Sequence, residues 1–178
     1  MKALIDGDIL RYEIGYAAET GWKAITDRDE IPPFDYVKDL LDGRIAYILN
    51  ATGATEYEMF LTEGQTFRDE IAITKPYKGN RIDKKPWHYY NLTAHINGAH
   101  PTTVVRGIEA DDQIAIVHIS SEPNATIICS RDKDLRQVPG LLYSWELGKQ
   151  PSFGPVEITK TGMLSLSKGQ SDSKIKGT

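Results

Sequence analysis

Short strand patterns that alternate with helical patterns constrain the fold of this chain more than any other feature. Residues 2–6, KALID, are typical of a short buried strand, and residues 9–19 that follow have helical apolar spacing. Further strand patterns cover 57–62, 67–73, 102–105, 125–130 and 141–145, and further helical patterns cover 34–52, about 86–96 and 111–120. Such alternation predicts an α/β fold with a central, mostly parallel sheet and helices on both faces.

The length of 178 residues suits one sizeable core. The polar segment 20–33 ends in Pro-Pro and predicts a loop. Near residue 148 the composition changes, because residues 156–166 predict a β-hairpin and the rest is a Ser/Lys/Gly tail. We therefore expect a compact catalytic domain over residues 1–148, followed by a hairpin and flexible tail over residues 149–178.

The single cysteine, Cys129, lies in the apolar run ATIICS and is predicted to be a small core residue. A chain with no possible intramolecular disulfide fits a reducing compartment. The N-terminus has no signal-peptide pattern, and no apolar run approaches 18 residues. We expect a cytoplasmic protein, in the host cytoplasm if it is viral, with no membrane partner.

Acidic side chains cluster at three equivalent places, each directly after a strand pattern. Because the carboxyl ends of parallel strands meet at one edge of a sheet, these side chains are expected to converge on one crevice. At the start of the helix near residue 110, Glu109 and Asp112 are three apart and predicted to share a face, whereas Asp111 turns aside. The seven carboxylates are Asp6, Asp8, Glu109, Asp111, Asp112, Asp132 and Asp134.

Such a concentration of negative charge requires compensation. The positive end of a helix offsets only about 0.3–1 kcal/mol, and crowded carboxylates otherwise raise one another's pKa. An all-oxygen donor set suits Mg²⁺ or Mn²⁺, and two such ions can activate water and stabilise a leaving oxygen. An acidic, solvated helix start would explain EADD alone, but DGD and DKD at neighbouring strand ends favour a metal site.

A basic, aromatic-rich patch covers residues 75–90, KPYKGNRIDKKPWHYY, although the whole chain has a net charge of -4. Lysine and arginine side chains bind phosphates, and aromatic rings stack on unpaired bases. An acidic pocket beside a basic patch indicates a metal-dependent nuclease. As alternatives, the basic residues could be plain solvated surface, and Trp87 and Tyr90 could anchor a helix in the core. The four histidines, at 88, 95, 100 and 118, show no metal-ligand spacing.

Four motifs, in order over residues 4–137, resemble the flap-endonuclease and 5′-3′ exonuclease family of the PIN-like superfamily, especially its bacteriophage members. LIDGD resembles the opening of the family, GIEADD its central signature and CSRDKDLRQV the next one. KPYKGNR resembles the Tyr-Lys-x-x-Arg segment in the arch above the active site. The resemblance implies a PIN-like 5′-nuclease domain and metal ligands at Asp6, Asp8, Glu109, Asp111, Asp112, Asp132 and Asp134.

The resemblance also implies an activity, namely magnesium-dependent hydrolysis of DNA from 5′ ends or flaps, as in DNA replication. Lys78 and Arg81 would contact the scissile phosphate and act in catalysis together with Asp6 and Asp111. The implied DNA-binding residues are Lys75, Tyr77, Lys78, Arg81, Lys84 and Lys85.

Two departures from the family pattern matter. The chain has LTEGQTFR where many relatives place an Asp before Phe-Arg, so Glu63 is the nearest candidate there. It also stops at Thr178, before the family's Gly-Asp-x-x-Asp-Asn motif and a helix-hairpin-helix element. We therefore expect a chain truncated at its C-terminus, an incomplete two-ion site, and a missing or separate C-terminal segment as a possible partner.

Three rival functions stay open at this point. LIDGDIL also resembles the opening of haloacid-dehalogenase-type phosphatases, in which Asp6 would be a nucleophile and Asp8 an acid/base, although that family expects Thr or Val at Leu10. A small ribonuclease of the toxin PIN type is closer in fold to the predicted domain than the phosphatase is. The third alternative is a non-catalytic or split nuclease fragment that binds DNA and metal.

Overall fold

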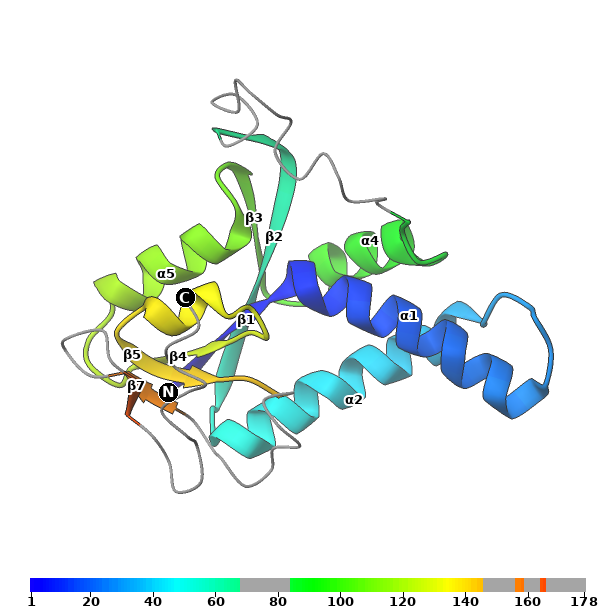
Figure 1. Cartoon of the computed structure of the whole chain (residues 1–178), viewed down its shortest axis with the longest axis horizontal. Coiled ribbons are helices and arrows are strands. Elements are labelled where there is room, and N and C mark those ends of the chain that lie inside the picture. Colours follow the sequence, from blue (N-terminus) through cyan, green and yellow to red (C-terminus); the bar gives the residue numbers. More distant parts are fainter. Residues whose placement is uncertain (68–83, 146–155, 159–163, 166–178) are drawn as a thin grey trace.

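The computed structural model describes residues 1–67 and 84–145 and the backbone of two further strands, 156–158 and 164–165. Among these residues, one seven-stranded sheet has the order β3-β2-β1-β4-β5-β6-β7 (Figure 1). The strands are β1 (Lys2–Asp6), β2 (Glu56–Thr66), β3 (Thr102–Gly107), β4 (Thr126–Cys129), β5 (Gly140–Tyr143), β6 (Val156–Ile158) and β7 (Leu164–Ser165). The helices are α1 (Gly7–Thr26), α2 (Phe34–Thr52), α4 (Tyr89–Ala99), α5 (Ala110–Ser120) and the 3-10 helix η1 (Asp134–Gln137).

The first five strands are parallel, and β1 lies between β2 and β4. Strand β6 pairs with β5 in the antiparallel sense, and β7 pairs with β6 in the same sense. The predicted α/β class with a mostly parallel sheet is therefore confirmed. The strand predicted at 67–73 lies largely outside the described residues, and the boundary proposed near residue 148 stays a prediction.

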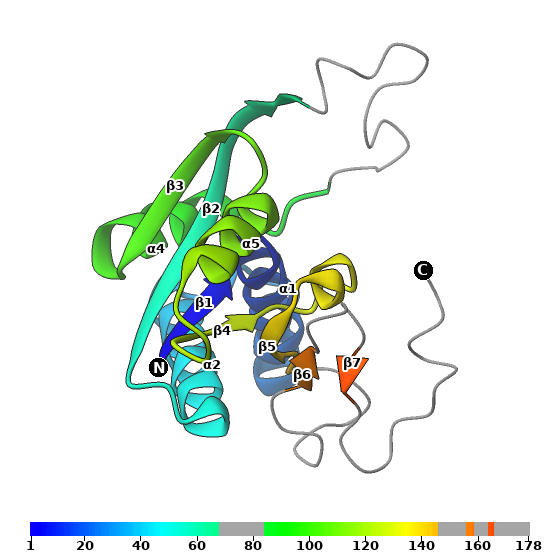
Figure 2. The same ribbon diagram turned by 90° about the vertical axis from the view of Figure 1, so that its left-hand side faces the viewer.

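Helices cover both faces of the sheet. Consecutive residues of β1 point to opposite sides, so each face contributes to its own core cluster. Ala3 and Ile5 belong to the core cluster that contains α1, α2 and α4, whereas Leu4 packs with Ile114 of α5 in a second cluster. Figures 1 and 2 show α5 on one side of the sheet and the other three helices on the opposite side. Cys129 is fully buried in the larger cluster, as predicted. In the described part of the chain, no helix is both long and apolar enough to cross a membrane.

Helix α1 is longer than expected, because it continues to Thr26 through part of the segment predicted to be a loop. Trp22 explains this difference: its ring packs on Tyr36 with centroids 5.3 Å apart, and its Nε1 donates a hydrogen bond to Glu30. The tertiary contacts of Trp22 thus override the polar composition of the segment. Helix α4 covers Tyr89–Ala99, about three residues later than predicted.

Two helical glycines differ sharply in their surroundings, and this difference gives a stability test. A Cβ at Gly15 of α1 would lie 2.4 Å from Cγ of Pro86, a rigid ring, whereas one at Gly43 of α2 would meet nothing within 4 Å. We expect Gly15→Ala to lower the free energy of unfolding by about 1–3 kcal/mol through overpacking. Gly43→Ala, the matched control, should raise it by about 0.5–1 kcal/mol through helix propensity. Urea denaturation measures both; equal effects at the two sites would contradict the close packing of α1 on Pro86.

Candidate active site

Three acidic motifs meet where the parallel strands end. Asp6 is the last residue of β1 and the N-cap of α1, so Asp8 falls in the first turn of that helix. Glu109 is the N-cap of α5, which follows β3. Asp132 follows β4, which pairs with β1. The topology therefore brings carboxylates from distant parts of the sequence to one edge of the sheet, as the spacing predicted.

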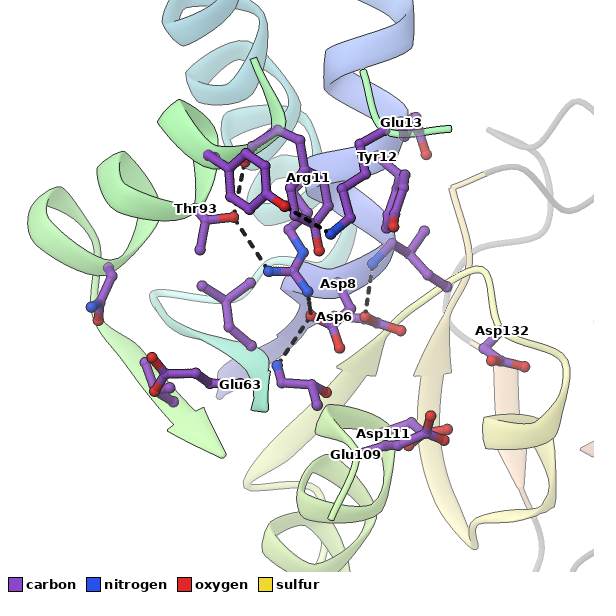
Figure 3. A pocket seen from close by; sticks show the side chains of 18 of the residues that line it. Asp6, Asp8, Arg11, Tyr12, Glu13, Glu63, Thr93, Glu109, Asp111 and Asp132 are labelled. Carbon is purple, nitrogen blue, oxygen red and sulfur yellow. Dashed lines mark hydrogen bonds and ion pairs between the residues drawn. The ribbon is translucent and has the colours of Figure 1, made fainter. Parts of the chain in front are cut away.

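A pocket of about 1070 Å³ opens at this edge. Figure 3 shows Asp6 and Asp8 near its centre, Glu109 and Asp111 together at the start of α5, and Asp132 on the loop after β4. Five of the seven predicted carboxylates line the pocket, namely Asp6, Asp8, Glu109, Asp111 and Asp132. Asp112 and Asp134 are not among the described residues that line it.

Asp6 is the most unusual of these acids, since only 3% of it is exposed. Ser130 donates a hydrogen bond to its Oδ2 at 2.7 Å, and the backbone N–H of Ile9 donates to Oδ1 at 3.1 Å. The pKa of Asp6 is nevertheless raised to about 7, mainly by burial and to a smaller extent by the negative charges of Asp8 and Asp111, against the two hydrogen bonds that lower it. A cation at this position would stabilise the ionised form.

Asp8 is held by groups from two elements, α1 and β2. Its Oδ1 lies 2.7 Å from Nη2 of Arg11 and accepts a hydrogen bond of 3.1 Å from the backbone N–H of Thr62 in β2. Arg11 is buried, donates to Thr93 Oγ1 at 3.3 Å and lies over the Tyr89 ring at 4.5 Å. We did not identify Arg11 from the sequence, although its i, i+3 spacing from Asp8 was a usable signal.

The carboxylates at the start of α5 are oriented differently from the sequence prediction. Glu109 and Asp112 form a reciprocal capping box, in which Asp112 accepts a hydrogen bond from the backbone N–H of Glu109. Asp111, expected to turn aside, lines the pocket beside Glu109, and Asp112 does not. Glu109 and Asp112 share a face, as predicted, but the capping box directs the Asp112 carboxylate back to the helix end, and Asp111 lines the pocket instead of turning aside.

The loop after β4 is organised by a chain of hydrogen bonds. Ser130 Oγ, which donates to Asp6, also accepts from the backbone N–H of Asp132 at 2.9 Å. Asp132 Oδ1 in turn accepts from the backbone N–H of Asp134 at 2.9 Å. Asp132 therefore reaches the pocket, whereas Asp134 begins η1 and is exposed.

Two further cations, Lys85 and Arg131, line the same pocket. Lys85 Nζ lies 4.8 Å from the ring centre of Tyr89 and 5.0 Å from that of Tyr90. Arg131, which the sequence analysis did not single out, is paired with Glu13 at 3.0 Å. Lys84 is exposed and does not line the pocket in the described structure. The predicted residues Lys75, Tyr77, Lys78 and Arg81 lie outside the described residues.

Two aromatic residues near this rim are more exposed than one interpretation assumed. Trp87 is 66% exposed and Tyr90 is 68% exposed, so neither anchors α4 in the core. Tyr89 is buried instead and fills that role. The exposed ring of Tyr90 therefore borders the pocket together with Lys85.

Glu63 lies in the lining of the pocket but has a partner of its own. Its Oε2 is 2.5 Å from Nη2 of Arg106 at the end of β3, and both side chains are largely exposed. The position that departs from the family motif is therefore occupied by a surface ion pair.

The donor chemistry of the pocket fits a hard divalent cation. The carboxylates that line it offer oxygen atoms, and Mg²⁺ or Mn²⁺ prefers oxygen ligands with room for water. The buried Asp6 carboxylate, whose pKa is raised when no cation is near, is the observation that supports this fit.

Comparison with solved structures identifies neighbours of the same fold. A T5 protein co-crystallised with metal ions has a TM-score of 0.56 at 16% identity, over 81% of this chain and 55% of that chain. The flap endonuclease of bacteriophage T5 with DNA and metal ions gives 0.53 at 16%, over 81% and 54%. A T5 5′-exonuclease with divalent zinc ions gives 0.51 at 18%, over 82% and 55%.

These neighbours confirm the predicted resemblance at the level of the fold, which is that of phage 5′-nucleases. This chain spans about half the length of the neighbouring chains. No family model matches the sequence, and no curated protein matches it. The likeness therefore rests on three-dimensional structure.

The raised pKa of Asp6 predicts how stability depends on pH without divalent ions. The folded state binds this proton more tightly than the unfolded state, so the stabilisation is complete below about pH 4 and is lost as pH rises to about 7. The cost at pH 8 is on the order of 4 kcal/mol. Asp6→Asn should remove this part of the slope, and Asp39→Asn, at an exposed position of α2, should retain it. Urea denaturation in EDTA from pH 4 to 8 measures it; parallel curves for wild type and Asp6→Asn would contradict the assignment.

Proposed function

We propose that this chain is a divalent-metal-dependent nuclease that hydrolyses DNA phosphodiester bonds at 5′ ends or flaps. The observation that carries the proposal is the convergence of five carboxylates, among them the buried Asp6, at the carboxyl edge of a parallel sheet. The fold shared with phage 5′-nucleases supports this assignment over a phosphatase. One pocket combines these acids with cationic side chains, which favours a nuclease over the phosphatase.

In this proposal Asp6, Glu109, Asp111 and Asp132 hold Mg²⁺ or Mn²⁺. A bound ion of this kind lowers the pKa of water and stabilises the leaving oxygen of a phosphodiester. Asp8 is a positioning residue, because its Oδ1 is engaged by Arg11 and by the backbone of β2. Asp112 and Asp134 shape the helix start and the loop that present the ligands.

Cationic groups of the pocket would receive the substrate. Lys85 and Arg131 line it and offer positive charge to a phosphate, and the exposed ring of Tyr90 offers a face for an unpaired base. Lys78 and Arg81 are proposed, from the family resemblance alone, to contact the scissile phosphate, with Lys75, Tyr77 and Lys84 as further DNA contacts. The preference for 5′ flaps, a role in replication, a cytoplasmic location and a separate C-terminal segment are parts of the same proposal.

A flap-cleavage assay with paired substitutions tests the proposal. With Mg²⁺, the full chain should cut a labelled 5′-flap duplex, and EDTA should abolish cutting. Asp111→Asn should lower the rate on the order of 100-fold or more, because its carboxylate faces the pocket. Asp112→Asn should cost less than about tenfold, because an amide can still cap the helix.

The outcomes separate the rival functions. Cutting that persists in EDTA, or equal losses for the two variants, would overturn the proposed mechanism. Hydrolysis of a phosphomonoester without cleavage of DNA would favour the phosphatase. Cleavage that begins only when a separately made C-terminal segment is added would identify a split enzyme.

A further inference from the structure

A second cluster of metal-ligating side chains lies away from the acidic pocket. Asp42 of α2, His95 of α4 and His100, the C-cap of α4, place one donor atom each within 4.8 Å of one another. Helix α4 contributes Tyr89, Tyr90, Thr93 and Asn97 to the lining of the pocket, but neither His95 nor His100. His100 instead contacts Tyr57 at the start of β2, so the cluster lies toward the amino edge of the sheet.

A buried ring nitrogen of His100 points to a ligand at this cluster. Its side chain is only 8% exposed, and its Nε2 is a buried nitrogen with no hydrogen-bond partner among the described residues. Nε2 lies 3.6 Å from Asp42 Oδ1, too far for a hydrogen bond. A buried polar atom without a hydrogen bond is costly, so its retention calls for a binding partner.

The other nitrogen of the same ring is already engaged. His100 Nδ1 and the Tyr57 hydroxyl lie 2.9 Å apart. When Nδ1–H donates to the Tyr57 oxygen, the lone pair of Nε2 is directed at the cluster, which is the arrangement that outer-shell partners impose on metal-binding histidines. Burial lowers the pKa of His100, and the neighbouring His95 lowers it as well, whereas Asp42 acts in the opposite direction. The pKa is lowered on balance, so the neutral ring prevails near pH 7.

We propose that Asp42, His95 and His100 bind a zinc-class transition-metal ion, a site separate from the carboxylate pocket. Two imidazole nitrogens and one carboxylate oxygen form a donor set that suits Zn²⁺ and Co²⁺ and disfavours Mg²⁺. Asp42 is 61% exposed, which gives an ion access from solvent and leaves room for water as a fourth ligand. The ion would join α2 to the end of α4, two helices that pack on the same face of the sheet.

The site does not depend on the proposed nuclease function, because none of its three residues lines the pocket. The proposed ion would act on the stability of the fold, because an ion that binds only the folded chain raises the free energy of unfolding by mass action. Zn²⁺ should therefore raise the Tm of the full chain by several degrees, in a buffer whose excess Mg²⁺ occupies the carboxylate pocket.

Cobalt and zinc titrations test the inference without reference to catalysis. In excess Mg²⁺, Co²⁺ should bind the full chain with the visible absorption of a nitrogen- and oxygen-ligated ion, and Zn²⁺ should displace it. Asp42→Asn and His95→Gln should each weaken Zn²⁺ at least about tenfold. Asp39→Asn is the matched control on α2, where it is exposed, and should bind as the wild type does.

A second control distinguishes the two metal sites. Asp111→Asn alters the carboxylate pocket and should leave zinc affinity unchanged, whereas loss of zinc binding in that variant would assign the ion to the pocket and overturn the inference. Absence of Co²⁺ and Zn²⁺ binding, or unchanged affinity in both Asp42→Asn and His95→Gln, would also overturn it. Thermal unfolding without metal verifies that each variant is folded; both substituted side chains are accessible to solvent, so two independent variants are available.

Discussion

The burial of one carboxylate organises the active edge of this protein. Asp6 ends the central strand, caps α1 through the backbone of Ile9 and accepts a hydrogen bond from Ser130 at the end of β4. The same Ser130 hydroxyl then positions the backbone of Asp132. One side chain thus fixes a helix start, joins the ends of two neighbouring strands and orients a further acid. A cation would stabilise its ionised form, and this is the physical reason that we propose for the crowding of acids.

The acidic residues at this edge divide into two kinds by what their oxygens contact. Asp112 is engaged at a helix end, and Asp8 is held by Arg11 and the backbone of β2. Glu109 does both, since it caps α5 and also lines the pocket with Asp111. Capping is worth about 1 kcal/mol, so local helix geometry is enough to decide which of two adjacent carboxylates faces inward. Charge density alone therefore does not show which carboxylates line the pocket.

Sequence patterns predicted the sheet, its parallel order and the convergence of three acidic motifs, because each depends on local apolar period and on chain connection. They failed where side chains from distant segments decide the outcome. Trp22 extends α1 by packing on Tyr36, and the capping box leaves Asp111, and not Asp112, in the lining of the pocket. Arg11 was missed although it lies three residues after Asp8, because the spacing alone does not show that the arginine is buried. Its contacts with Asp8, Thr93 and Tyr89 exist only in three dimensions.

The histidine cluster illustrates the same limit from the other side. His95 and His100 are five residues apart, a spacing that gives no helical face in common, and Asp42 is distant in sequence. They meet because α4 ends between them and His100 adopts an extended backbone that turns its ring toward α2. Opposite edges of the sheet thus offer different donors: carboxylate oxygens at one, imidazole nitrogens at the other. The two donor sets differ in preference, because carboxylate oxygens suit Mg²⁺ or Mn²⁺ and imidazole nitrogens suit zinc-class ions, so the two proposed sites would favour different cations.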